Sequence, residues 1–161
     1  MRRKRSFRHQ QAGFSLIELL IVVAIIAILA TVAVPKLLKI LETGRESAAM
    51  QNLKRIHENE TLYQTRKQRF GTLKELTEEG ILDTSFASGA PISGYIYTST
   101  AEVSQDKFCV QATRSSATTA SKDYNVDQDG AVRYVESKSP SAVACGEGTP
   151  ITGQGNATGA Q

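Results

Sequence analysis

The hydrophobic pattern of the chain begins with an almost unbroken apolar segment near the N-terminus. Residues 14–34 read FSLIELLIVVAIIAILATVAV, and Glu18 is the only charged residue among these 21. As a helix the segment is apolar on every side, which is typical of a helix surrounded by lipid or by other helices. Its helical length, roughly 31 Å, is enough to span the hydrocarbon core of a bilayer. The pattern predicts a helix that crosses a membrane or forms the core of an assembly.

The pattern becomes amphipathic after Pro35. Apolar residues recur at helical spacings to about residue 66, and charged residues, Glu46 and Glu60 among them, interleave with them. This pattern predicts that one helix covers residues 14–66. Pro35 removes a helical hydrogen bond and favours a kink, and Gly44 weakens the helix locally by about 1 kcal/mol relative to alanine. The apolar series is Leu38, Leu41, Ala48, Ala49, Leu53, Ile56 and Tyr63.

A short second helix is predicted after the long one. Thr72 and Glu75 have the spacing of a capping box, in which the side chain of each residue accepts a hydrogen bond from the backbone N–H of the other at the start of the helix. Gly80 then provides a residue suited to end the helix.

Alternating segments in the C-terminal half predict an antiparallel sheet. Residues 94–100 alternate aromatic or branched side chains with small ones, and residues 107–113 place Phe108, Val110 and Ala112 on one face. Further along, residues 123–136 are centred on an Asp-Gly pair at positions 129 and 130, a strong hairpin signal. About three to four strands would pack on the rear half of the long helix, giving an α+β fold.

A cluster of basic residues precedes the apolar segment and accounts for the positive balance of the chain. The sequence has 19 basic and 16 acidic residues, a net charge of +3. Residues 1–13 hold five of the basic residues and no acidic one, so the remaining 14 basic and 16 acidic residues give −2. A nucleic-acid-binding protein is therefore not indicated by charge. By the positive-inside rule the leader stays cytoplasmic and the chain after residue 35 is exported. The five residues are Arg2, Arg3, Lys4, Arg5 and Arg8.

Two ordinary interpretations compete for this N-terminus. A cleaved secretory signal peptide also combines basic and apolar segments, but here the apolar segment is too long and no convincing small-residue cleavage site follows it. An ordinary signal anchor leaves Glu18 unexplained, because a carboxylate near a helix centre costs about 2.5–3.5 kcal/mol on insertion scales. A residue this costly is a candidate functional residue.

The residues around Gly13 resemble the prepilin peptidase signature of type IV pilins and type II secretion pseudopilins. A short basic leader ends in Gly13, Phe14 follows, and Glu18 stands four residues later in an apolar helix. The resemblance implies that a prepilin peptidase and N-methyltransferase cuts between Gly13 and Phe14 on the cytoplasmic side and methylates the new amine of Phe14. It also implies the long helix with a bend at the proline and glycine named above.

The cut gives Glu18 a partner. It creates a positive α-amino group at Phe14, and in a filament of staggered helices Glu18 of one subunit can face the Phe14 amine of the next. Two charges that are costly in an apolar medium then neutralise each other, which favours correct register more than raw stability. The alternative is that Glu18 only reaches the membrane interface.

Two cysteines and three aspartates are the remaining candidate site residues. If their half is exported, Cys109 and Cys145 form one disulfide, and the chain-entropy model gives about 3–4 kcal/mol for a loop of roughly 35 residues. In many pilins a disulfide of this kind ties the C-terminal region to the sheet. Asp123, Asp127 and Asp129 suggest calcium, which some pseudopilins hold in this part of the chain, but the full calcium-loop pattern is absent and solvated turn residues are the alternative. We assign no metal and no cofactor.

These inferences divide the chain into a leader (1–13), a membrane or filament-core helix (14–34), an exported domain (35–146) and a flexible tail (147–161). They predict a structural subunit, a major pilin, that enters the inner membrane as a precursor and joins identical subunits in an extracellular filament through the pilus machinery. A pseudopilin of a type II secretion system is the alternative within the family, and the disulfide favours the pilin.

Functions of other classes have less support. No nucleophile, base and orienting residue combine, and His9 and His57 are isolated, so an enzyme is not predicted. A membrane-anchored adhesin or DNA-binding module would need a basic face, for which Arg114, Lys122 and Arg133 are sparse, and nucleic acid is not expected as the main ligand.

Overall fold

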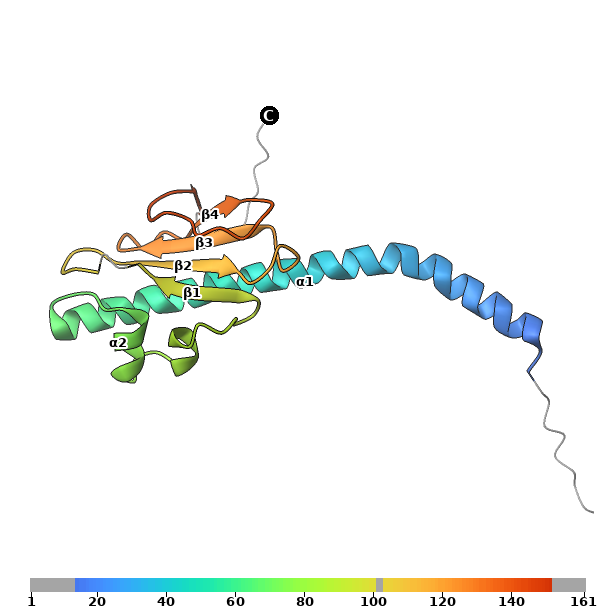
Figure 1. Cartoon of the computed structure of the whole chain (residues 1–161), viewed down its shortest axis with the longest axis horizontal. Helices are drawn as coiled ribbons and strands as arrows, with labels where there is room; N and C mark the ends of the chain where they lie inside the picture. Colours follow the sequence, from blue (N-terminus) through green and yellow to red (C-terminus); the bar gives the residue numbers. More distant parts are fainter. Residues whose placement is uncertain (1–13, 101–102, 152–161) are drawn as a thin grey trace, which may run out of the picture. The chain divides into compact units, whose positions relative to one another are not determined.

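The computed structural model describes residues 14–100 and 103–151. The chain divides into two units, Met1–Lys39 and Ile40–Gln161. Helix α1, Leu16–Lys67, belongs to both, and every other helix and strand lies in the second unit of the described structure (Figure 1). Its bounds confirm the predicted helix of residues 14–66 within two residues.

The first unit is the apolar part of α1. The helix continues through Pro35, although proline has no N–H to donate to the carbonyl four residues earlier. Nearly all side chains of this part are exposed, including Ile25 and Leu29, because nothing in the described chain covers them.

The second unit begins with the amphipathic part of α1, which buries one stripe of side chains at alternating steps of three and four. The stripe includes the expected Ala49, Leu53, Ile56 and Tyr63, but also two glutamates that we had placed with the interleaved charges. That placement was wrong. Glu46 stands three residues before Ala49 and Glu60 stands four residues after Ile56, so both lie on the same face of the helix as the stripe. The complete stripe is Glu46, Ala49, Leu53, Ile56, Glu60 and Tyr63.

An antiparallel sheet of five strands packs on this stripe. The strand order is β1-β2-β3-β4-β5, so each strand pairs with its neighbour in sequence. The α+β class is confirmed, with one strand more than the predicted three to four. The strands are β1 (Tyr95–Ser99), β2 (Cys109–Arg114), β3 (Lys122–Asp127), β4 (Arg133–Glu136) and β5 (Thr149–Pro150).

The extra strand lies where we expected a flexible tail from residue 147. Thr149 pairs with Tyr134 of β4, and the Ile151 N–H donates to the Val132 carbonyl at 2.8 Å. Ile151 also packs against the hydrophobic core. The chain is therefore structured to residue 151, and residues 152–161 lie outside the described residues.

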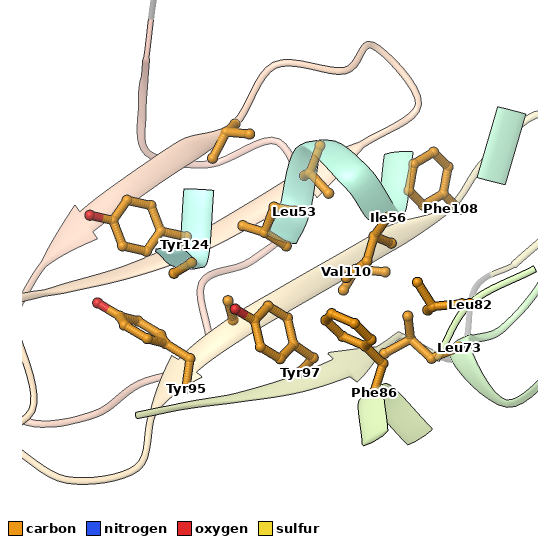
Figure 2. Packing of buried hydrophobic residues seen from close by; sticks show 14 of the residues in the cluster. Leu53, Ile56, Leu73, Leu82, Phe86, Tyr95, Tyr97, Phe108, Val110 and Tyr124 are labelled. Atoms are coloured by element: carbon orange, nitrogen blue, oxygen red, sulfur yellow. The ribbon is translucent and has the colours of Figure 1, made fainter. Parts of the chain in front are cut away.

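The core lies between α1 and the inner face of the sheet (Figure 2). Leu53 and Ile56 of α1 meet Tyr97, Val110 and other inward side chains of β1–β3. Register brings Tyr97, Ala112 and Tyr124 side by side across three strands. The predicted common face of residues 108, 110 and 112 is confirmed, because all three are buried.

The predicted short helix is α2, Leu73–Glu78. Its capping box is present: Thr72 Oγ1 accepts the Glu75 N–H at 3.2 Å, and Glu75 Oε2 accepts the Thr72 N–H at 2.8 Å. Gly80 follows the helix end, as predicted. A 3-10 helix, η1 (Thr84–Ala87), then leads towards β1.

The predicted hairpin joins β3 to β4 through residues 128–132, a longer loop than the Asp-Gly pair alone. The Gly130 N–H donates to the Asp127 carbonyl at 3.0 Å, and Gly130 has a φ of 77°, which glycine adopts at no steric cost. The ring of His57 on α1 lies against this turn, 2.9 Å from where a Cβ of residue 130 would be. His57 is half-buried rather than a solvated surface side chain.

Candidate functional site: the start of the N-terminal helix

The start of α1 carries the residues expected to be processed. Phe14 and Ser15 precede the helix, and the Ser15 carbonyl accepts the Leu19 N–H at 3.2 Å. Phe14 is 74% exposed. Gly13 and the rest of the leader lie outside the described residues. The chain on the C-terminal side of the expected cut is therefore an exposed, non-helical dipeptide.

Glu18 lies in the first turn of α1 and is exposed. The unpaired N–H groups at a helix start favour a negative side chain there, by about 0.3–1 kcal/mol in water. Within residues 14–100 and 103–151, no basic side chain forms an ion pair with Glu18. In a membrane or a helical bundle an ionised carboxylate without a partner is costly.

The surface around Glu18 is apolar. In the described part of the chain, every exposed large apolar side chain except Leu62 and Val135 lies between Phe14 and Leu41. The helix is long and apolar enough there to cross a membrane. Such a surface, exposed over more than five turns, marks a contact with lipid or with other protein chains.

The comparison with known families agrees with this placement. The family model described as the prokaryotic N-terminal methylation motif matches residues 8–34. Residues 8–34 are a type IV pilin-like prepilin signal. The prepilin signal supports membership of the pilin and pseudopilin family and implies processing by a prepilin peptidase. Proteins with this signal are structural rather than enzymatic, and a search of curated proteins finds no match to the chain.

The two positions expected to bend the helix behind the prepilin signal are both helical in this structure. A Cβ on Gly44 would meet nothing within 4 Å, so packing within the described chain does not require glycine there. The roles of Pro35 and Gly44 as bends stay predictions.

The structure joins Cys109 and Cys145 in the expected disulfide. The bond attaches the C-terminal strap, which we define as residues 137–148, to β2. Side chains on the outer face of the sheet hold the same strap through its backbone: Gln111 donates to the Val143 carbonyl at 2.9 Å, and Asn125 donates to the Glu147 carbonyl at 2.9 Å. Sequence reasoning missed this polar face, although β3 alternates it with buried apolar residues.

The three candidate calcium ligands form ion pairs with arginines. Asp123 pairs with Arg114 at 2.9 Å, and Asp127 and Asp129 both pair with Arg133. Hydrogen bonding to Arg133 holds the pKa of Asp129 well below its ordinary value. Among residues 14–100 and 103–151 no three acidic, histidine or cysteine side chains gather at one point. Asp123 and Asp127 are thus buried ion-pair partners rather than solvated turn residues. Asp129 is an exposed turn residue, as the alternative interpretation has it, and pairs with Arg133.

The same contacts remove the basic face considered for nucleic acid. Arg114 is buried, Arg133 pairs with two aspartates, and Lys122 pairs with Glu46 at 3.2 Å. Glu46 also accepts the hydroxyl of Ser121 at 3.2 Å. This glutamate therefore fastens α1 to the start of β3, a role that sequence reasoning missed.

Proposed function

We propose that the chain is the precursor of the major subunit of a type IV pilus-like filament. Hydrolysis of the Gly13–Phe14 bond releases the leader and leaves a positive amine on Phe14, which is then N-methylated. The observation that carries the proposal is Glu18: an exposed carboxylate without an ion-pair partner in the described chain, set in an apolar surface and inside a prepilin signal.

The pairing chemistry follows from the site. An amine and a carboxylate about 4 Å apart gain about 4 kcal/mol at an effective dielectric of about 20, which offsets part of their desolvation in an apolar core. A subunit out of register leaves both charges unpaired. The pair between Glu18 of one subunit and Phe14 of the next therefore selects the helical stagger, and the apolar surface supplies most of the attraction.

The topology fits an exported domain. The leader charges stay cytoplasmic, the apolar part of α1 to residue 34 is anchored in the inner membrane, and the unit Ile40–Gln161 folds outside the cytoplasm. A disulfide between Cys109 and Cys145 is stable in such an oxidising compartment.

The test is filament assembly by the full-length Glu18→Lys variant in cells with a prepilin peptidase and pilus machinery. We expect normal membrane insertion, measured by alkaline extraction, and loss of sheared filaments by at least tenfold. Glu58→Lys is the matched control, since Glu58 is an exposed glutamate on the other part of α1. Normal filaments from Glu18→Lys would refute the pairing.

A pseudopilin of a type II secretion system is the second candidate, and the prepilin signal serves both. The disulfide between β2 and the C-terminal strap favours the pilin. Deleting the gene and imaging cells decides between them: loss of surface filaments supports the pilin, whereas intact filaments with lost protein secretion support the pseudopilin.

A further inference from the structure

Glu60 is a buried carboxyl with too few partners. It lies on the buried stripe of α1 with 0% of its surface exposed. Its Oε2 accepts the Gly71 N–H at 3.0 Å, and its Oε1 has no hydrogen-bond partner in the described residues. The other glutamate of the stripe, Glu46, has a lysine and a serine as partners. An ionised Glu60 would therefore be a buried charge held by one neutral donor.

The partner of Glu60 lies in a short segment that joins α1 to α2, residues 68–72, which we call the connector. The connector packs tightly between α2 and α1, because a Cβ on Gly71 would lie 2.6 Å from Leu76 Cδ1 of α2 and 3.0 Å from Tyr63 Cε1 of α1. Phe70 holds its other side: its N–H donates to the Ser104 carbonyl at 3.0 Å, and its ring centroid lies 4.8 Å from that of Phe108.

Among the residues that the structure describes, no basic side chain forms an ion pair with Glu60. Arg69 in the connector is turned to Glu75 of α2, with Nη2 and Oε1 2.5 Å apart, and Arg69 also donates to the Tyr63 hydroxyl. Burial raises the pKa of Glu60 from its ordinary 4.5 to about 7, while the Gly71 N–H acts against the rise. Other described charged or titratable groups of the surrounding elements include His57 beside Phe108, Lys67, Glu78 and Glu79 at the ends of α1 and α2, and the exposed Asp106 and Lys107 of the β1–β2 loop. Glu102 of that loop lies outside the described residues.

We propose that Glu60 is a proton-operated latch: the protonated carboxyl keeps the connector closed on α1, and the ionised carboxylate opens it to water. When the connector is open, water solvates the Glu60 carboxylate; when it is closed, that carboxylate has almost no solvation. A cleft of about 310 Å³ borders the connector, so opening changes a surface of the second unit. The cleft is lined by Tyr63, Lys67, Arg69, Glu75, Glu78 and Glu79.

Hydrogen exchange measures the latch directly on the full-length chain in detergent. Amide exchange of residues 70–73, corrected for the intrinsic dependence of exchange on pH, reports the opening equilibrium of the connector. With a pKa of 4.5 open and about 7 closed, opening rises on the order of a hundredfold between about pH 5 and about pH 8.5. Glu60→Gln, which keeps the acceptor for Gly71 and cannot ionise, should show no such rise. Glu58→Gln, an exposed neighbour on α1, should behave as wild type.

Equal protection of the wild-type connector at both pH values would overturn the latch, as would a pH dependence that survives in Glu60→Gln. If circular dichroism shows that Glu60→Gln is misfolded, the carboxyl carbon shift of Glu60 in the wild type decides. A midpoint near pH 7 that coincides with a change in the Gly71 amide supports the latch, and a midpoint near the ordinary 4.5 overturns it. None of these readouts requires a filament, so the latch and the pilin proposal fail separately.

Discussion

The ion pair between Arg114 and Asp123 offers the sharpest test of what stabilises the second unit. Both side chains are 1% exposed, and Arg114 Nη2 lies 2.9 Å from Asp123 Oδ2. Arg114 further donates to three backbone carbonyls and one hydroxyl, and Asp123 accepts N–H groups from residues 114 and 141. The additional partners of the pair are Ala120, Ser137, Ser139 and Ser141.

Replacing Arg114 with methionine keeps most of the side-chain length and leaves Asp123 as a buried carboxylate without its cation. Breaking a buried pair in this way costs about 3–5 kcal/mol, because one charge stays uncompensated. The variant also loses the donors that fix the 115–121 loop and the C-terminal strap. We expect the loss to shift the thermal midpoint down by roughly 10 °C for a chain of this size.

Urea unfolding of the full-length chain, followed by circular dichroism, measures this cost. Lys74→Met is the control, since the Lys74–Glu78 pair is 78% and 63% exposed and should contribute less than about 1 kcal/mol. The double variant Arg114→Met/Asp123→Leu should recover part of the lost stability, because it removes the unpaired charge as well. A loss below about 1 kcal/mol in Arg114→Met would show that the buried pair does not organise the sheet.

Three further variants test the connector and the C-terminal strap by urea unfolding. The free energy of unfolding of the wild type should fall by about 3 kcal/mol as pH rises from 4.5 through about 7. The reason is that over this range the folded state still holds a proton on Glu60, whereas the unfolded state has released it. The free energy of unfolding of Glu60→Gln should lack this pH dependence. Gly71→Ala should cost about 1–3 kcal/mol by overpacking against Leu76 and Tyr63, and an unchanged midpoint would contradict the close approach. Cys145→Ser removes the disulfide, which joins residues 36 apart, and should lower the free energy of unfolding by about 3–4 kcal/mol. A variant as stable as the oxidised wild type would show that the polar contacts alone hold the strap.

Local signals in the sequence predicted the elements well. The extent of α1, the capping box of Thr72 and Glu75 and the inward face of β2 all follow from periodicity or from spacing within a few residues. The strand β5 could not be predicted in this way. It is two residues long, and its stability comes from pairing with β4 and from the packing of the partly buried Ile151 against the core, which are contacts between distant parts of the chain.

The charged residues show more clearly that local sequence does not reveal contacts between distant parts of the chain. Periodicity extended from Ala49 would have placed Glu46 and Glu60 on the buried stripe, but charge alone suggested solvent. Which carboxylate meets which arginine depends on strand register, so Asp123 and Asp127 could be singled out as unusual without their partners being identified. The prepilin signal is the opposite case, because it is a linear segment, residues 8–34, that does not depend on contacts between distant parts of the chain.

The most direct test of the central claim is the intact mass and N-terminal sequence of the protein purified from membranes of cells that contain a prepilin peptidase. The account predicts a chain that begins at Phe14, lacks residues 1–13 and carries one extra methyl group on its α-amine. A chain that begins at Met1, or one cut after the apolar segment, would contradict it.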